Sequence, residues 1–475
     1  MKIKFKLIVI SGMLLLLNMN TNANYIKPAD KIFLAENTER YSQSAQSSKN
    51  DSLPEGFTDE VMKDLRDEFG QNIIPEDEGD AFQQRSFNGF ATGDIYGFSV
   101  STAGDVNGDG YDDIIIGAPQ NSFAGTYAGR AYIYYGGINV NSIADVILTG
   151  ETANNFFGYS VSSAGDVNGD GYSDVIAGAY GYSSFTGRAY IFYGGAVMNN
   201  SADVIMSGEN AGDDFGYSVS GAGDVNGDGY KDVLIGAFGN NSLTGSSYIY
   251  FGGSSMNNVS DITFYGEFPN DNFGNSVSTA GDLNGDSYSD ILIGASQYDS
   301  YTGKVYVYYG GSSMDNINDL SMTGENISNY FGTSVAGAED LNLDGYSDLV
   351  IGAPGANGSA GRAYVYYGGA SIDNIEDLIL NGENPNDEFG LSVSSAGDVN
   401  GDGFSDIIAG SANFSSYKGR AYIYFGGVTM NNTSDLTITG EATVNYFGSS
   451  VSTAGDVNGD GYSDVIIGAY GFNSI

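Results

Sequence analysis

Asp224-Val225-Asn226-Gly227-Asp228-Gly229-Tyr230-Lys231-Asp232 is one of seven similar copies of a nine-residue pattern in this chain. The copies begin at Asp105, Asp166, Asp224, Asp282, Asp340, Asp398 and Asp456, and the intervals are 61 residues once and 58 residues five times. Self-similarity at a fixed period indicates a repeat architecture, in which each unit buries its apolar faces against its neighbours. The 475-residue chain is therefore predicted to be an array of similar units.

Each repeat has the pattern of four short strands joined by glycine-rich turns, as the unit around Asp224 illustrates. Residues 215–220 form a first strand before the Asp loop, and the apolar run 233–237 is typical of a strand buried on both faces. Residues 247–253 and 260–267 follow as third and fourth strands. Four strands per unit match one propeller blade. The sequence thus predicts an all-β, seven-bladed β-propeller of four-stranded antiparallel blades, with an open solenoid as the alternative.

The N-terminal region differs from the repeats. A basic stretch and an 11-residue apolar run, 7–17, precede small residues near Ala23, so residues 1–23 are predicted to be a secretory signal peptide. The alternative is an N-terminal membrane anchor, although the run is short for a span. Residues 24–86 are a polar linker with a short amphipathic helix expected at 58–69. The propeller is assigned to residues 87–475.

The last repeat is expected to be truncated. It has a first strand, an Asp loop and a second strand, and then the sequence given stops at Ile475. Residues 85–93 match the end of a fourth strand and are expected to form the outer edge of this blade. No segment is identified for the third strand, so we expect the full protein to continue beyond Ile475.

The Asp loops are the candidate metal sites. Positions 1, 3, 5 and 9 supply side-chain oxygens and position 7 a backbone carbonyl, a ligand set that suits a hard cation such as Ca²⁺. Up to seven Ca²⁺ ions are predicted. The candidate ligands are Asp105, Asn107, Asp109, Tyr111, Asp113, Asp166, Asn168, Asp170, Tyr172, Asp174, Asp224, Asn226, Asp228, Tyr230, Asp232, Asp282, Asn284, Asp286, Tyr288, Asp290, Asp340, Asn342, Asp344, Tyr346, Asp348, Asp398, Asn400, Asp402, Phe404, Asp406, Asp456, Asn458, Asp460, Tyr462 and Asp464.

Two loops depart from the common pattern. Ser287 replaces the glycine at position 6, and Leu343 replaces the glycine at position 4. Because serine is strained at positive φ, we expect the Asp282–Asp290 site to be the weakest. Position 12 is Ile or Ala in every copy, never the bidentate Glu of an EF-hand, and an apolar strand follows directly. An Asx-rich turn without metal is the other reading of a single loop.

Composition excludes several functions. The net charge of −42 argues against nucleic-acid binding through a basic surface. The chain has no His and no Cys, which removes imidazole bases, thiol nucleophiles and disulfides. Many carboxylates belong to the metal loops, so we expect no enzyme activity.

The repeats resemble a known family. Phe-Gly at the first strand and Gly-Ala-Pro after the second are the two signatures of FG-GAP repeats, which build the β-propeller of integrin α chains and of many bacterial secreted proteins. The first signature stands at Phe157-Gly158 and five later copies, with Tyr96-Gly97 as a variant, and the second is intact at Gly117-Ala118-Pro119 and Gly352-Ala353-Pro354. The resemblance implies calcium between the first two strands of blades, cell adhesion, and ligands on the face opposite the calcium loops.

Variation among the repeats indicates where a ligand would bind. The loops between second and third strands (119–128, 180–186, 238–244, 296–302, 354–360 and 412–418) and those joining blades (for example 210–214 and 385–388) differ most. Both sets lie on the face opposite the Asp loops. Among these loops are Tyr180, Tyr182, Phe185, Phe238, Tyr298, Tyr301, Phe414 and Tyr417. Exposed rings would suit a glycan or protein ligand, and packing between loops is the alternative.

One cationic position recurs. It is Arg130, Arg188, Arg362 and Arg420 in four repeats, with Lys304 and Ser246 in two others. Repetition favours a structural role, either a salt bridge to the next blade or a cover over the tyrosines.

The sequence therefore favours a secreted or cell-surface, calcium-binding propeller for adhesion or recognition, with a protein or glycan ligand and no membrane span in the mature chain. An accessory propeller of an extracellular hydrolase or lyase, and a structural envelope scaffold, are the alternatives.

Overall fold

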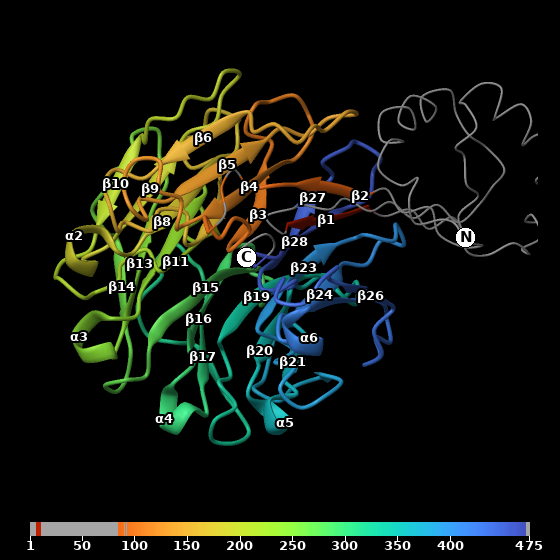
Figure 1. The fold of residues 1–475 in the computed structure, drawn as a ribbon. Helices are drawn as coiled ribbons and strands as arrows, with labels where there is room; N and C mark the ends of the chain where they lie inside the picture. The colour runs from red at the N-terminus through yellow and green to blue at the C-terminus, as the bar shows by residue number, and fades with distance from the viewer. Residues whose placement is uncertain (1–5, 11–83, 90, 92, 472–475) are drawn as a thin grey trace, which may run out of the picture.

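Seven sheets stand around a common centre in the computed structural model, which describes residues 6–10, 84–89, 91 and 93–471 (Figure 1). Six of them are four-stranded and antiparallel, and each is built from four consecutive strands. Each first strand lies beside the first strands of the adjacent blades, so the first strands surround the axis and the fourth strands form the rim. The predicted β-propeller of four-stranded antiparallel blades is confirmed for these six.

The strands occupy equivalent places in every repeat. The first blade contains β3 (Val100–Gly104), β4 (Asp113–Ala118), β5 (Arg130–Tyr134) and β6 (Val146–Thr149). The second contains β7 (Val161–Gly165), β8 (Asp174–Ala179), β9 (Arg188–Phe192) and β10 (Val204–Ser207). The third contains β11 (Ser218–Gly223), β12 (Asp232–Ala237), β13 (Ser246–Tyr250) and β14 (Ile262–Tyr265).

The next three blades repeat this order. The fourth contains β15 (Phe273–Gly281), β16 (Asp290–Ala295), β17 (Lys304–Tyr308) and β18 (Leu320–Thr323). The fifth contains β19 (Ser334–Glu339), β20 (Asp348–Ala353), β21 (Arg362–Tyr366) and β22 (Leu378–Asn381). The sixth contains β23 (Ser392–Gly397), β24 (Asp406–Ser411), β25 (Arg420–Tyr424) and β26 (Leu436–Thr439).

The seventh sheet joins the two ends of the chain. β27 (Val451–Gly455) and β28 (Asp464–Gly468) pair antiparallel as in the other blades, and β2 (Gln84–Phe87) forms the outer edge, as the sequence predicted. The expectation that no segment supplies the third strand is wrong for this structure. β1 (Lys6–Ile10) lies there, because the edge of β28 offers unpaired backbone groups, but it runs parallel to both neighbours. Only β27 and β28 keep the blade pattern, so the seventh blade is partial.

Two expectations for the N-terminal region stay predictions. The signal peptide assigned to residues 1–23 includes β1, and its other residues lie outside the described part of the chain. The helix expected at 58–69 also lies outside the described residues, as does most of the 24–86 linker.

The core lies between neighbouring blades. The second strand of each of the first six blades is buried along its whole length, which explains its unbroken apolar pattern. These strands are β4, β8, β12, β16, β20 and β24. The Phe of each Phe-Gly pair lies between two blades. Phe157, for example, packs edge-on against Tyr190 at 5.4 Å between ring centroids and bridges to Gly129 of the preceding blade. Tyr96 takes this place in the first blade, where its hydroxyl lies 2.6 Å from that of Tyr134.

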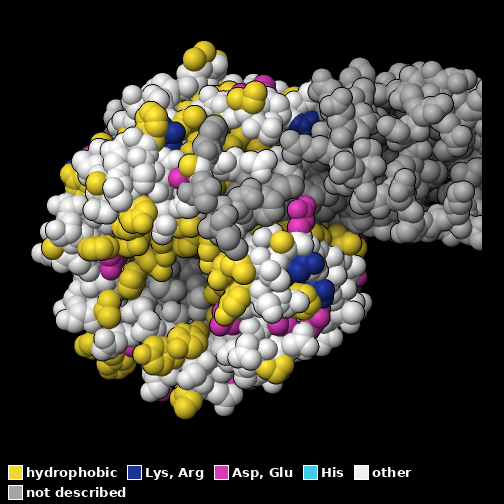
Figure 2. Space-filling view, in the orientation of Figure 1, with side chains coloured by type: hydrophobic (Ala, Val, Ile, Leu, Met, Phe, Trp, Pro, Cys, Tyr) yellow, Lys and Arg dark blue, Asp and Glu magenta, His cyan; other side chains and the backbone are white. Residues whose placement is uncertain are grey.

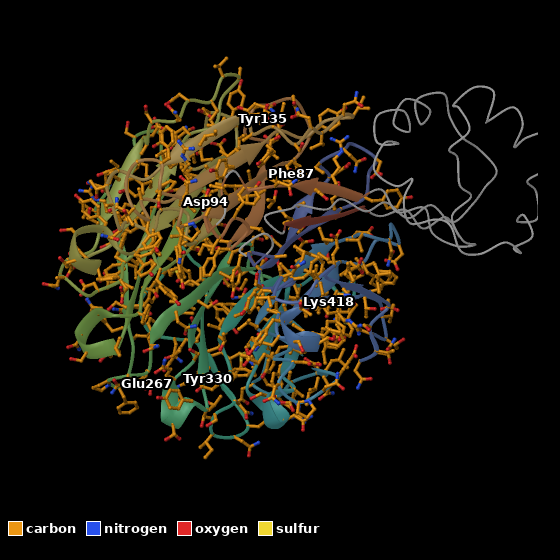
Figure 3. The ribbon with its side chains drawn as sticks, in the orientation of Figure 1. Phe87, Asp94, Tyr135, Glu267, Tyr330 and Lys418 are labelled. Atoms are coloured by element: carbon orange, nitrogen blue, oxygen red, sulfur yellow. The ribbon has the colours of Figure 1, made fainter. Side chains whose placement is uncertain are left out.

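Serine hydroxyls connect the innermost strands. Ser99 Oγ accepts the backbone N–H of Val161 in the next blade at 3.0 Å, and four further pairs repeat this bond. Ser450 of the last repeat accepts the N–H of Val100 of the first at 3.2 Å. At the rim, Phe87 of β2, which is labelled in Figure 3, packs against a ring of the first blade. That ring is Tyr134 of β5, and the two ring centroids are 4.4 Å apart. These contacts close the disc between its last and first blades.

Short helical turns form the loops between second and third strands in blades two to six. They are α2 (Tyr182–Phe185), α3 (Asn240–Leu243), α4 (Tyr298–Tyr301), α5 (Ala356–Ser359) and α6 (Phe414–Tyr417). Among the described residues, no helix is long and apolar enough to cross a membrane.

Candidate metal loops and the opposite face

The first Asp loop folds around its own side chains. Asp105 Oδ1 accepts the N–H groups of Gly108 and Asp109, and its Oδ2 accepts that of Gly110 at 2.9 Å. Asn107 Oδ1 accepts the N–H of Asp109, and Asp109 Oδ1 accepts that of Tyr111. Gly110 has φ of 89°, which only glycine adopts freely. These bonds gather the oxygens of positions 1, 3 and 5 on one turn.

The same arrangement recurs around the disc. In all seven loops the carboxylate at position 1 accepts the N–H groups of positions 5 and 6. In all seven, position 5 accepts the N–H of position 7. The candidate ligands at positions 1, 5 and 7 therefore occupy one local geometry in every repeat.

Position 9 is placed differently from the other carboxylates. Asp113 begins β4 and is fully buried, with Oδ2 accepting the N–H of Val106 and Oδ1 that of Gly136, which follows β5. Burial raises the pKa of Asp113 to about 7; the two backbone donors oppose this rise, and the charges of Asp109 and Asp105 add to it. Burial likewise raises the pKa to about 7 at Asp174, Asp232, Asp290 and Asp348, and to about 8 at Asp406.

The donor set of these loops fits a hard cation. It consists of carboxylate, amide and carbonyl oxygens only, and the buried position-9 carboxylate is costly to ionise without a positive charge nearby. Within the described residues, no three acidic side chains are gathered closely enough to mark a metal site by themselves. In six loops the structure thus brings positions 1, 3 and 5 together and uses position 9 to fasten the loop to its own blade. In the Asp456 loop, Asn458 Nδ2 instead donates to Asp464 Oδ2 at 2.8 Å.

Adjacent loops touch through positions 4 and 7. A Cβ on Gly108 would lie 2.5 Å from Cε1 of Tyr172 in the next loop, and six loops have this close approach between glycine and tyrosine. The series includes Gly459 of the last loop and Tyr111 of the first, 2.4 Å by the same measure. Position 4 is therefore glycine because the ring of the next loop occupies the space of a side chain.

The two departing loops show different degrees of strain. Ser287 has φ of 74°, as the sequence predicted, and keeps its N–H bond to Asp282. The Asp340 loop departs more than expected, because Leu343 and Glu339 both have φ of 58°. In the other six loops the N–H of position 4 also bonds to position 1, and no such bond is found for Leu343 among the described residues.

The opposite face carries a continuous row of aromatic rings in one half of the disc. Phe98, Tyr159 and Tyr217 each follow a Phe-Gly or Tyr-Gly pair, and their rings lie 4.7 and 4.8 Å apart in turn. Phe238 extends the row on one side, 4.4 Å from Tyr217, and Tyr470 extends it on the other, 5.6 Å from Phe98. We call these five half-buried rings the aromatic arc. Beyond Tyr470, the ring of Tyr446 stacks on it at 4.9 Å.

The other half of this face is different. In blades four to seven, the residues that follow the Phe-Gly pair are Asn275, Thr333, Leu391 and Ser449.

Figure 2 shows hydrophobic side chains gathered toward the middle of the visible face, with charged side chains scattered around them.

The aromatic residues expected on this face have two roles. Phe238 is itself part of the arc, and Tyr180 packs against the arc with its ring centroid 4.6 Å from that of Tyr159. Phe185, Tyr301 and Tyr417 are between 44 and 46% exposed. Tyr182, Tyr298 and Phe414 instead lie beneath the side-chain cations of Arg188, Lys304 and Arg420, so for these three the packing interpretation holds.

Sequence reasoning missed Phe98, Tyr159, Tyr217 and Tyr470. The residue after Phe-Gly was the available signal, because it changes from aromatic to non-aromatic halfway along the repeats.

The recurrent cations have the predicted structural role. Arg188, Lys304, Arg362 and Arg420 each pair with a glutamate of the preceding blade, and the Arg188–Glu151 distance is 2.9 Å. Arg130 lies over the ring of Phe123, with its guanidinium carbon 3.6 Å from the centroid. Glu267, the partner of Lys304, lies near α4 in Figure 3.

Two hollows occupy equivalent places on the varied face. One, of about 490 Å³, is lined by residues 268–271 and 297–301 beside α4. The other, of about 680 Å³, is lined by residues 384–388 and 413–417 beside α6. Both lie where a blade-joining loop meets a loop between second and third strands, the two loop sets that vary most.

Comparison with known proteins agrees with this geometry. The FG-GAP repeat family matches residues 96–134, 157–192, 215–251, 273–308, 331–366, 389–424 and 447–474, together just over half of the chain. Integrin alpha-5 of Xenopus laevis is 36% identical over 165 residues, which are 32% of this chain and 16% of that protein. Integrin alpha-6 of Gallus gallus is 36% identical over 161 residues, covering 32% and 14%.

Human integrin alpha-IIb is 32% identical over 176 residues, covering 34% of this chain and 17% of that protein. The matched segments thus span about one sixth of these relatives. Among solved structures, the Dos1 propeller is similar with a TM-score of 0.39 and 11% identity, over 72% of this chain and 74% of that one, a likeness too slight to carry an argument. On its seven matched repeats, the chain belongs to the FG-GAP repeat family and forms an integrin α-like β-propeller.

Proposed function

We propose that this chain is an extracellular, calcium-binding propeller that acts as a non-catalytic adhesion or recognition module. The Asp loops would hold Ca²⁺ on one face, and the opposite face would bind a protein or glycan. The observation that carries the recognition role is the aromatic arc, because an aromatic residue follows the Phe-Gly or Tyr-Gly pair only in the first three blades of a face whose backbone repeats in all seven.

The cation sites are proposed at the seven loops, with ligands from the side chains of positions 1, 3, 5 and 9 and the carbonyl of position 7. Bound Ca²⁺ would supply positive charge to loops that otherwise hold at least three carboxylates each. The all-oxygen donor set and the raised pKa of the buried position-9 carboxyls support this proposal. The role of the loops would then be to stiffen one face of the disc.

The ligand face is proposed from the chemistry of its rings. Tyrosine and phenylalanine offer flat apolar area with few rotatable bonds, and tyrosine adds a hydroxyl that can bond to a ligand. The Tyr159 hydroxyl donates to that of Tyr217 at 3.0 Å, which fixes both rings in place. A preorganised, partly exposed row of rings suits the apolar face of a sugar or a protein side chain.

The integrin α relatives and the predicted signal peptide support the proposed secreted location and adhesion role. An accessory propeller of an extracellular hydrolase or lyase remains the second candidate from sequence, and the absence of His and Cys from the chain weighs against catalysis by this chain itself.

The test grafts one part of the ligand face onto another. Tyr217→Asn with Phe238→Ser places in the third blade the residues Asn275 and Ser296 that the fourth blade already has. The full chain, with calcium present, is applied to immobilised glycans and extracellular-matrix proteins. We expect the unaltered chain to bind at least one of these probes and the grafted variant to lose at least tenfold in affinity.

The matched control is Asn275→Thr, which lies outside the aromatic arc and replaces Asn275 with the residue that blade five has at this position, Thr333. This variant should bind like the unaltered chain, and melting temperatures verify that both variants are folded. Equal binding by the grafted variant would contradict the proposed ligand face. Cleavage of a polymer probe by the purified chain would contradict the non-catalytic role.

A further inference from the structure

The eighth residue of each Asp loop lies against the preceding blade's loop. Its N–H donates to the carbonyl of position 1 of that loop at 2.9 to 3.2 Å, in all seven interfaces. Its side chain packs against the residue that comes just before position 1 of that preceding loop. A Cβ on Gly397 would be 2.3 Å from Ser463 Oγ, and Ser405 Oγ donates to Glu339 at 2.8 Å. Each loop therefore has one side chain from the next blade beside it.

This side chain is serine in five interfaces, and the exceptions are charged. Lys231 lies over Gly165, beside the Asp166 loop, and its side chain is exposed. Asp112 lies over Gly455, beside the Asp456 loop, where a Cβ would be 2.2 Å from its Oδ2. The acidic exception stands at the interface between the last and first blades.

Asp112 and Asp456 form two hydrogen bonds, and each residue donates its backbone N–H in one of them. The N–H of Asp112 donates to the carbonyl of Asp456 at 3.2 Å, and the N–H of Asp456 donates to Asp112 Oδ2 at 2.8 Å. The two residues are 344 positions apart in the chain, whereas the other interfaces join consecutive repeats. The Asp456 loop thus has a carboxylate from another blade hydrogen-bonded to its first candidate ligand.

We propose that Asp112 is an additional acidic residue of the Asp456–Asp464 site, contributed by the first blade, and that it makes this site the tightest calcium site of the disc. The inference rests on the proposed calcium function. An extra negative charge beside a divalent cation strengthens binding by Coulomb attraction, which water screens only in part. We expect the gain to be about fivefold in affinity. Calcium there would link the last blade to the first, two blades that are not formed by consecutive repeats of the chain.

The experiment measures each loop separately in the full chain. Hydrogen exchange of loop peptides is followed by mass spectrometry while Ca²⁺ alone is titrated, so every loop gives its own calcium midpoint. We expect the Asp456 loop to be protected at a calcium concentration about fivefold lower than the Asp398 loop. The Asp166 loop, beside Lys231, should require more calcium, by a smaller factor because that cation is exposed.

Three variants separate charge from hydrogen bonding. Asp112→Asn keeps an oxygen acceptor for the N–H of Asp456 and removes the charge, so it should raise the midpoint of the Asp456 loop about fivefold. Asp112→Ser supplies the residue of five other interfaces and should do at least as much. Ser463→Asp moves the acid to the next interface and should lower the midpoint of the Asp398 loop.

The outcomes are distinct. An unchanged Asp456 midpoint in Asp112→Asn, with calcium-dependent protection present, overturns this inference alone and leaves Asp112 as a hydrogen-bond acceptor. The same holds if Ser463→Asp leaves the Asp398 loop unchanged. Absence of calcium-dependent protection in every loop overturns the proposed calcium function itself.

Discussion

The two faces of this disc are built on the same repeating backbone but differ in how far their side chains repeat. On the Asp-loop face, positions 1, 5 and 9 are Asp in all seven repeats, and their hydrogen bonds recur. On the opposite face, the residue before each Phe-Gly or Tyr-Gly pair has φ between 47 and 56° in every blade, yet its side chain ranges from Ile95 to Asp214 and Tyr446. Uniform side chains indicate a structural or cation-binding role, and varied side chains on a fixed frame suit recognition.

The largest expected effect comes from breaking the uniformity of the Asp-loop face. Gly227→Ala would place a Cβ 2.5 Å from Cε1 of Tyr288 in the next loop and would also force alanine to φ of 76°. We expect a loss of about 3 kcal/mol in the free energy of unfolding, from overpacking and left-handed strain together. Denaturant unfolding in EDTA measures this loss without any contribution from calcium.

The matched control for that change lies two residues away. Gly229 has φ of 91° but nothing within 4 Å of its Cβ position, so Gly229→Ala should cost only the strain, about 1 kcal/mol. Equal losses for both variants would mean that the contact between adjacent loops adds nothing.

A smaller effect is expected from restoring uniformity. Leu343→Gly and Ser287→Gly put glycine where φ is 58 and 74°, so each should stabilise the protein by about 1 kcal/mol in the same assay. Ser289→Gly, in the Asp282 loop but outside the left-handed region, should instead give no gain. If Ser289→Gly stabilises as much as Ser287→Gly, backbone strain is not what distinguishes these loops.

The smallest effect is expected at the salt bridges beneath the varied face. Among blades two to six, only the third has no cation at the recurrent cationic position, which is Ser246 there. An arginine introduced by Ser246→Arg would face Glu209 as Arg362 faces Glu325. Because these pairs are partly exposed, the gain should be about 0.5 kcal/mol and should shrink in 1 M salt. Arg362→Ala should lose a similar amount, and a salt-independent change would point to packing instead of charge.

Much of the fold was predictable because the signal is repeated. Seven copies of Asp-x-Asn-x-Asp at a fixed interval define the blades, and the apolar run after each loop identifies the buried second strand. The structural role of Arg188 and its equivalents also followed from repetition, and the pairs with Glu151 and its equivalents confirm it.

The features that sequence reasoning missed depend on contacts between distant parts of the chain. The placement of β1 against β28 and the mutual bonds of Asp112 and Asp456 have no local signature. Phe98, Tyr159 and Tyr217 form an arc only because the closed disc brings the starts of successive blades together. The left-handed conformations of Leu343 and Glu339 follow from the neighbouring loops, which impose one backbone on every repeat.

We propose that the Asp-loop face is uniform because it binds calcium. Thermal unfolding of the full chain with excess Ca²⁺, excess Mg²⁺ or EDTA, together with calcium stoichiometry by calorimetry, tests it most directly. Each filled site adds about 2.7 kcal/mol when free calcium is a hundred times its Kd, so we predict a large, calcium-selective rise in melting temperature and about seven ions bound. Identical melting in Ca²⁺ and EDTA, with no ions bound, would contradict the claim and leave the Asp loops as hydrogen-bonded turns.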